Sequence, residues 1–296
     1  MEIIERGVFD DLEYALLEDR TAAVIGYLGS AEEPVIPDAL HGCRVTVIGN
    51  KAFSDCADLY RITVPDSVVS IGDYAFYECS ALKEIVISDS AVSIGRSAFA
   101  NCVSLRSVTM PNSVRSIGDS AFSHCESLRG ITLPERLTAV GDRMFSHCRS
   151  LTGIDIPDGA VLIGEGAFEA CRRLRTVTLP DTAASIGRGA FSGCRSLSTV
   201  ALPRSVTAVK DETFSGCGSI NRIIVPPGVT LIGDRAFYAC EWLYEISLPD
   251  SVRHIGSDAF SACYHLARVI VRRGSRAEAY CRRNDLPCVY ADAEMQ

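Results

Sequence analysis

The chain contains no long apolar run and few aromatic residues. No stretch reaches the roughly 18 consecutive apolar residues of a membrane-spanning helix, and only 7% of the 296 residues are aromatic, with a single tryptophan. The first six residues, Met-Glu-Ile-Ile-Glu-Arg, lack the basic start and the apolar core of a secretory signal. We therefore expect no membrane insertion, and this start favours a cytoplasmic location.

Signatures of catalysis and of metal binding are also missing. There is no Gly-x-Ser-x-Gly, no phosphate-binding loop, no His-Glu-x-x-His and no Cys-x-x-Cys. Residues 187–193 miss the dinucleotide-binding pattern by one position. Acidic residues such as Asp66 and Asp158 follow prolines, which is typical of turns rather than of paired catalytic carboxylates. We predict a protein that is not an enzyme and needs no cofactor.

Both signs of charge are present, but no region is strongly basic. Residues 1–44 have ten acidic side chains and three arginines, residues 45–274 have 23 of each sign, and the net charge is −8. Nucleic acid is therefore not an expected partner. An apolar content of 47% excludes disorder because it can form a sizeable core. The change in charge near residue 45 indicates a separate N-terminal unit.

What the sequence does contain is a repeat of 23 residues. The repeat is marked by a phenylalanine, and a cysteine follows three positions later in every copy. The phenylalanines are Phe53, Phe76, Phe99, Phe122, Phe145, Phe168, Phe191, Phe214, Phe237 and Phe260. A frame that begins at Val45 yields ten units without insertion, ending at Gly274. Such a period predicts a solenoid whose stacked units share one core.

Within the first unit, apolar positions mark two extended segments. Near-alternation over 59–64 predicts a short, half-buried strand that ends in a turn at Pro65. Residues 45–48 predict a second extended piece, and residues 51–56 one helical or 3₁₀ turn. One unit cannot bury its apolar face alone. We expect ten coils, called rungs below, stacked in register about 4.8 Å apart as mainly short parallel strands.

The repeat Ile-Gly-x-x-Ala-Phe-x-x-Cys-x-x-Leu-x-x-Ile-x-Leu-Pro closely resembles that of the BspA-like bacterial leucine-rich repeat family, over about 230 residues. The resemblance implies a leucine-rich-repeat solenoid with a cap at each end. Residues 11–27 look like the N-terminal hairpin, with Arg20 at its turn, and residues 274–290 look like a closing helix and strand. We expect an acidic N-terminal cap (1–44), ten repeats (45–274) and a C-terminal cap (275–296) whose helix begins with the capping box Ser275 to Glu278.

The cysteines predict a buried spine of reduced thiols. Ten of the thirteen occupy one interior repeat position, where a free cysteine behaves as a small hydrophobe. The redox state of Cys43, Cys281 and Cys288, which lie in the expected caps, stays open.

His124 and His147 share a second repeat position, one rung apart. With Glu126 they could bind a metal, although we favour solvated surface histidines.

One unit departs from the code. In residues 206–228, Lys210 replaces the glycine, Thr213 the alanine and Ile220 the leucine. We predict a local irregularity at this rung, which either drift or a function would explain.

Candidate binding residues fall into three groups. Outward strand positions of the middle units, such as Thr109, Gly130 and Thr178, are small and polar. Two basic series repeat at the unit interval: Arg149, Arg172 and Arg195 after the cysteine, and Lys83, Arg106, Arg129 and Arg175 after the leucine. The aromatic residues of the last two units are Tyr238, Trp242, Tyr244 and Tyr264. The alternative for the arginines is that they form only a solvated rim. The alternative for the aromatic residues is that they dock against the C-terminal cap.

These features predict a non-catalytic, monomeric module that binds another protein through its strand face and rim. Arginine, tryptophan and tyrosine are enriched where binding energy concentrates, and the arginines favour a partner with an acidic or sulfated surface. The resemblance implies bacterial surface adhesion or host-protein binding, since family members are often secreted or on the cell surface. An intracellular scaffold or assembly protein is the alternative. Glycan binding, suggested by Trp242, is a weaker one.

Overall fold

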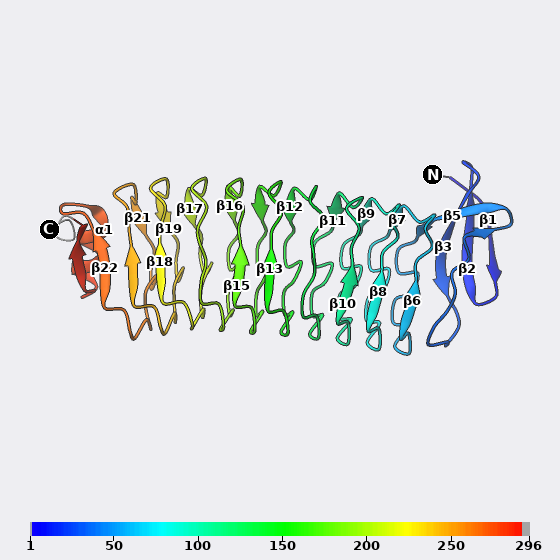
Figure 1. Cartoon of the computed structure of the whole chain (residues 1–296), viewed down its shortest axis with the longest axis horizontal. Coiled ribbons are helices and arrows are strands. Elements are labelled where there is room, and N and C mark those ends of the chain that lie inside the picture. The colour runs from blue at the N-terminus through cyan, green and yellow to red at the C-terminus, as the bar shows by residue number, and fades with distance from the viewer. Residues whose placement is uncertain (1, 292–296) are drawn as a thin grey trace.

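The 23-residue interval becomes one rung of an elongated solenoid in the computed structural model, which describes residues 2–291. The rungs stack along a single axis, and the two ends of the chain lie at opposite ends of the stack (Figure 1). Eight of the ten units contribute two short parallel strands and a tight turn, and the units 114–136 and 183–205 contribute only one such strand. The predicted repeat solenoid is confirmed, and its helix content is low.

The segment after the leucine forms the strand face. Its central residue is buried and its neighbours are largely exposed, as the alternation predicts. The strands are β6 (Arg61–Thr63), β8 (Glu84–Val86), β10 (Ser107–Thr109), β13 (Gly153–Asp155), β15 (Thr176–Thr178), β18 (Arg222–Ile224), β20 (Glu245–Ser247) and β22 (Arg268–Val271). Successive strands pair in parallel with a register of 23 residues.

A second ladder of two-residue strands precedes the tight turn in each rung. Its members are β7 (Ser70–Ile71), β9 (Ser93–Ile94), β11 (Ser116–Ile117), β12 (Ala139–Val140), β14 (Leu162–Ile163), β16 (Ser185–Ile186), β17 (Ala208–Val209), β19 (Leu231–Ile232) and β21 (His254–Ile255). We call it the short ladder.

Residues 51–56 form 3₁₀-type turns without a continuous helix: Ser54 N–H donates to Lys51 O at 3.0 Å and Cys56 N–H to Phe53 O at 3.4 Å. Lys51 (φ 58°) and Asp55 (φ 63°) adopt left-handed conformations, which interrupt any helix after one turn. Their neighbours bond along the solenoid axis instead: Phe53 N–H donates to Ala75 O at 2.8 Å. This third side therefore joins the rungs without forming a strand.

The core is a stack of phenylalanine rings flanked by thiols. Successive rings lie 5.2 to 5.6 Å apart between centroids, inclined by 3° to 9°. The Cys79 thiol donates to Phe53 O of the preceding rung at 3.0 Å, and eight later cysteines repeat this contact at 3.0 or 3.1 Å. Every cysteine is a free thiol in the structure. Cysteine fits this position because it is small and satisfies a buried carbonyl.

The N-terminal residues extend the short ladder as an antiparallel meander. β1 (Ile3–Phe9), which the sequence did not predict, pairs with β2 (Leu12–Leu17), and β2 pairs with β3 (Thr21–Tyr27). Arg20 adopts φ 61° at the turn of the expected hairpin. β3 then pairs in parallel with β5 (Cys43–Ile48), which joins β7; β4 (Ala39–Leu40) folds back on β5.

At the other end, α1 (Arg276–Arg283) and β23 (Cys288–Tyr290) cover the last rung. Ser275 Oγ accepts from Glu278 N at 3.1 Å, as the capping box predicts, while the Glu278 carboxylate accepts from Gly274 N at 2.6 Å. The hydrogen bond from the Gly274 backbone, together with the side-chain hydrogen bonds from Tyr290 and Arg282, holds the pKa of Glu278 below its ordinary value. β23 pairs in parallel with β22, so the edge of the strand face is covered here.

Both ladders are interrupted at two places. The short ladder breaks between β11 and β12 and again between β16 and β17; the strand face breaks around 130–132 and between 199–201 and β18. The second break is the irregularity expected for unit 206–228, and the first was not predicted. Each short-ladder break precedes a unit whose repeated core alanine is replaced, by Met144 or by Thr213, both fully buried. On the third side the same rungs stay joined, because Phe122 N–H donates to Met144 O and Phe191 N–H donates to Thr213 O, both at 2.9 Å.

Candidate functional site

The first arginine series does not behave as three equal charges. Arg149 is half-buried and pairs with Glu126 of the preceding rung, Nη1 to Oε1 3.1 Å. Arg172 and Arg195 are exposed, and neither makes an ion pair within residues 2–291. The series therefore offers two uncompensated guanidinium groups rather than three.

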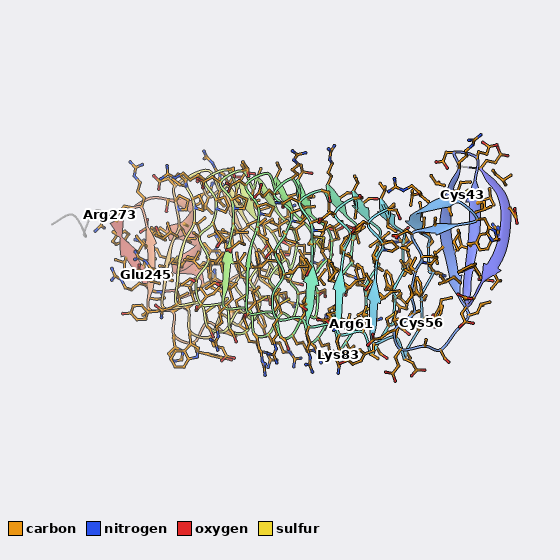
Figure 2. All side chains as sticks on the ribbon, turned by 45° about the vertical axis from the view of Figure 1, so that its right-hand side comes forward. Cys43, Cys56, Arg61, Lys83, Glu245 and Arg273 are labelled. Carbon is orange, nitrogen blue, oxygen red and sulfur yellow. The ribbon has the colours of Figure 1, made fainter. Side chains whose placement is uncertain are left out.

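The second basic series is interrupted by Thr152. Its N–H bonds to Arg129 O (3.2 Å) and its O accepts from Arg175 N (2.9 Å), so Arg129 and Arg175 lie two rungs apart. Both are exposed. Arg175 shares its loop with Arg172, which concentrates positive charge on unit 160–182. Near the N-terminal end, Lys83 Nζ lies 4.3 Å from the ring centroid of Tyr60 and close to Arg61 (Figure 2).

The aromatic residues face solvent rather than the C-terminal cap. Tyr264 is 79% exposed, Trp242 57% and Tyr244 48%. One face of the Trp242 indole stacks on His265 at 4.3 Å between centroids, inclined by 12°. The ring that packs between core and cap is Tyr280, edge-on to Phe260 at 6.2 Å. Docking of the exposed aromatics against the cap, the alternative left open by the sequence, is wrong.

The structure unites the two groups in one hollow. Arg195 and Trp242 line a shallow cavity of about 450 Å³ together with Gly218, Ser219 and Glu241. Gly218 occupies the repeat position of Arg195 in the next rung and has no side chain, so nothing fills the space between them. The sequence contains a signal for this hollow: the position after the repeated cysteine is Arg195, Gly218 and Glu241 in three successive units, so one unit lacks a side chain there.

His124 and His147 stack one rung apart, as their shared repeat position predicts, with centroids 4.3 Å apart. His147 also contacts Ser146 Oγ through Nδ1 at 2.9 Å. Burial, followed by the neighbouring charge of His124, lowers the pKa of His147. Glu126, the acid that could have joined the two histidines as a metal ligand, pairs with Arg149. Among residues 2–291, no three His, Cys, Asp or Glu side chains are grouped to hold a metal ion.

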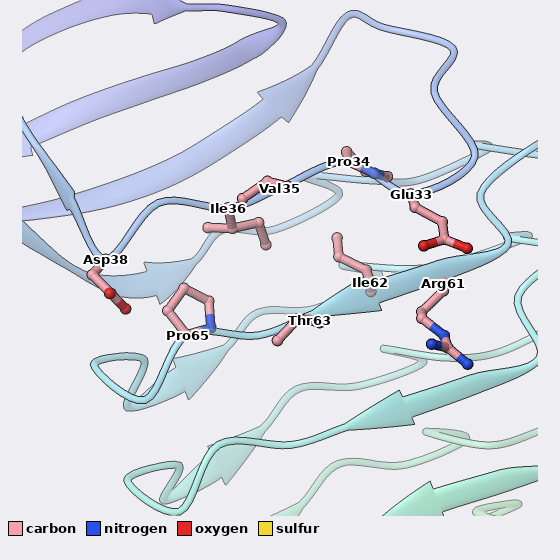
Figure 3. Close-up of a pocket in the computed structure, with 9 residues that line it drawn as sticks. All are labelled: Glu33, Pro34, Val35, Ile36, Asp38, Arg61, Ile62, Thr63 and Pro65. Carbon is pink, nitrogen blue, oxygen red and sulfur yellow. The ribbon is translucent and has the colours of Figure 1, made fainter.

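The strand face carries two cavities of its own. The small one, about 270 Å³, lies at the N-terminal edge, where residues 33–36 run beside β6 (Figure 3). The large one, about 1030 Å³, spans 176–179, 199–202 and 222–228. The outward residues Thr176, Thr178 and Thr199 are exposed along it, as the sequence predicts. No helix of the described residues has the length and apolarity needed to cross a membrane.

Comparison with known proteins settles the family. The profile of the BspA type leucine rich repeat region, in six copies, matches residues 46–175 and 161–279. The chain belongs to the BspA-type leucine-rich repeat family. BspA-type repeats are protein-interaction modules, and proteins built from them are generally non-catalytic. Functionally curated proteins gave no match.

Solved structures of several bacterial proteins are similar to this BspA-type chain. A leucine rich repeat protein of T. pallidum is 33% identical, with a TM-score of 0.60, covering 65% of this chain and 91% of that one. A leucine rich cell surface protein of Faecalibacterium prausnitzii is 29% identical, with a TM-score of 0.52, covering 94% and 97%. The pneumococcal vaccine antigen PcpA shares the fold at 15% identity, with a TM-score of 0.51, covering 98% and 99%.

Proposed function

We propose that this chain binds an acidic surface of a partner protein on an edge formed by Arg172, Arg175, Arg195, Trp242 and Tyr264, here called the basic–aromatic edge. The observation that supports it is the shared hollow of Arg195 and Trp242. A guanidinium without a counter-ion beside an exposed indole is the combination that concentrates binding energy in protein interfaces. Arg129, Arg149 and Tyr244 flank this edge and extend the contact.

The charge distribution supports an acidic partner. Parallel arginines on neighbouring rungs repel one another weakly in solvent, and a carboxylate-bearing partner relieves this repulsion through bidentate contacts. Because the whole chain carries a net charge of −8, acidic proteins are repelled elsewhere on the surface. Binding is thereby directed to the edge.

For the biological setting we favour adhesion at a bacterial surface or binding of a host protein. The similar F. prausnitzii structure is described as a cell surface protein. An intracellular scaffold would use the same edge. Trp242 supports glycan binding as a second candidate, because one indole face is stacked on His265 and 57% of the residue is exposed.

The test removes the charges together. We expect the variant Arg149→Ser, Arg172→Ser, Arg195→Ser to bind immobilised polyglutamate at least tenfold more weakly than the parent, whose binding falls as salt rises. Stability should change by less than about 1 kcal/mol, because Arg172 and Arg195 are exposed and the ion pair of the half-buried Arg149 is at the surface, where such pairs contribute little. The control Arg115→Ser, Arg136→Ser, Arg253→Ser alters the net charge equally outside the post-cysteine loops and should bind as the parent does. Equal binding by the first variant would place the binding surface elsewhere.

The partner itself is sought by capture from bacterial and host extracts on the immobilised parent chain and on both variants. A protein retained by the parent and the control but lost from the edge variant is the expected result. A sulfated polymer retained with the same pattern, and no protein, would contradict a protein partner. A polysaccharide retained only while Trp242 is intact would favour the glycan function.

A further inference from the structure

β18 has a strand edge inside the solenoid with which no other segment of the described residues pairs. Within residues 2–291, no backbone hydrogen bond joins 199–201 to β18, although β18 pairs regularly with β20. Figure 1 shows the ribbon before β18 standing farther from it than β20 does. The backbone groups at both ends of β18 point to β20: Asn221 O accepts a hydrogen bond from Glu245 N–H, and Val225 N–H donates one to Ser247 O. Strand alternation turns the N–H and C=O groups of Arg222 and Ile224 toward the gap.

The gap follows from the sequence of unit 206–228. Glycines at the position of Lys210 bring neighbouring rungs very close: a Cβ added to Gly187 would lie 2.4 Å from Gly164 C, and one added to Gly233 would lie 2.4 Å from Asp211 N. A lysine does not fit at that separation. Lys210 instead reaches Ser185 Oγ at 3.1 Å, and the paired strands on both ladders are lost.

The groove over this gap is mostly apolar, with a basic end. Val177, Leu179, Val200, Leu202 and Ile224 line it, and Ile224 is 59% exposed. Arg204 lies at the groove and makes no ion pair in the described part of the chain. At the same repeat position six units have an acidic residue: Asp66, Asp89, Glu135, Asp158, Asp181 and Asp250. Arg204 therefore reverses the commonest charge at this position beside the gap.

The chain covers an equivalent edge elsewhere with a segment of its own. Arg61 of β6 and Arg222 of β18 share one repeat position, and each pairs with a glutamate of the next rung, Glu84 or Glu245. Along the free edge of β6 runs the segment 32–36, Glu-Glu-Pro-Val-Ile, beside Arg61 (Figure 3). Glu32 O accepts from Tyr60 N at 2.7 Å, and Val35 pairs in parallel with Thr63. The edge of β18 has the same features but no such cover.

We propose that the groove beside β18 binds an extended segment of a partner protein, acidic at its start and apolar after it, which adds to the free edge as residues 32–36 cover β6. Main-chain hydrogen bonds to Arg222 and Ile224 supply the attachment, and the apolar wall and Arg204 select the sequence. This site shares with the proposed function only the premise that the chain binds proteins, because it lies on the strand face and not on the basic–aromatic edge.

The probe is the capped synthetic peptide SAEEPVIPD, which is residues 30–38 of this chain, titrated into the isotope-labelled full chain and followed by NMR. We expect the amide signals of Arg222 and Ile224 to shift and their hydrogen exchange to slow in proportion to bound peptide. The same peptide with lysine in place of both glutamates is expected to bind at least tenfold more weakly. Signals that do not respond at β18, or respond only at β6, would overturn the proposal.

Two variants that restore the repeat code test the cause. The double change Lys210→Gly, Thr213→Ala, which restores both repeat positions, is expected to close the gap, slow exchange at Arg222 and Ile224 without peptide, and weaken peptide binding at least tenfold. Arg204→Asp leaves the gap open and is expected to weaken binding roughly fivefold or more, while the control Arg136→Ser changes nothing. A parent chain in which these two amides already exchange as slowly as those of β20 would show a closed rung and refute the site. The arginine triple variant of the basic–aromatic edge should bind the peptide normally, which separates the two proposals.

Discussion

Gly187 lies directly against Gly164 of the preceding rung, so that an added Cβ would approach the carbonyl carbon of Gly164 to 2.4 Å. The same close approach recurs at Gly95, Gly118 and Gly164 along the short ladder. The repeated glycine is thus required by the separation of the rungs, and the position is intolerant of any side chain where the ladder is continuous.

We predict that Gly187→Ala destabilises the protein by roughly 1–3 kcal/mol, because backbone atoms must move to admit the methyl group. Gly130→Ala is the matched control: nothing lies within 4 Å of its added Cβ, and stability should change by less than about 0.5 kcal/mol. Urea unfolding of both variants measures the difference. Equal stabilities would mean that the rungs are not held at the observed separation.

The thiol spine predicts a specific pattern of reactivity. Burial raises the pKa of the interior thiols Cys125, Cys148 and Cys194, so the reactive thiolate is scarce there. We expect few cysteines to react with a thiol reagent in the native protein. The partly exposed Cys56, whose pKa is raised to about 11, should react faster than the buried Cys148. Denaturation without reductant should release all thirteen. A count of three would reveal five disulfides and refute the reduced spine.

His147 predicts a loss of stability in mild acid. Burial and the charge of His124 lower its pKa from 6.5 in the folded chain, so the unfolded chain takes up the proton first as the pH falls. The contribution of neutral His147 to the free energy of unfolding is complete above pH 6.5. It decreases as the pH falls below 6.5 and is fully lost once the pH has passed the lower pKa of the folded chain. His147→Gln should therefore show a flatter dependence of unfolding free energy on pH between 7.5 and 5.5.

The histidine comparison needs a second variant, because carboxylates also titrate toward the acid end of this range. His254→Gln removes an exposed histidine of β21 and should keep the parent's slope. Identical slopes for the parent and His147→Gln would show that His147 is as easily protonated in the fold as in the unfolded chain.

Deletion of residues 275–296 is expected to cause self-association. It removes Ala277 and Cys281, which are buried against the last rung, and the ring of Tyr280 that packs on Phe260. It also uncovers the edge of β22 with which β23 pairs. The contact of Arg273, labelled in Figure 2, is lost as well, since its guanidinium carbon lies 3.9 Å from the ring centroid of Tyr290. Exposed apolar ends and strand edges associate. Light scattering should detect oligomers while circular dichroism shows folded strands; a soluble monomer with unchanged Tm would contradict the prediction.

The sequence by itself determined the repeat, its register and its core. A strict 23-residue interval places equivalent residues one rung apart, and the phenylalanine and cysteine positions could therefore be assigned as interior from spacing alone. The cap at Ser275 also followed from a local signal, since it depends on neighbouring residues, whereas the hairpin of residues 11–27 was implied by the resemblance to the BspA-like family. The turn at 51–56 was predicted as a turn, but its left-handed conformations were not, because they are sustained by bonds to the next rung.

Only the tertiary structure decided which surface groups meet. Glu126 neutralises Arg149, Gly218 opens a hollow between Arg195 and Trp242, and residues 32–36 cover β6 while β18 stays bare. Each of these depends on contacts across rungs and on how far one rung stands from the next. Periodicity shows which residues are equivalent, whereas the packing of neighbouring rungs against one another decides which of them touch.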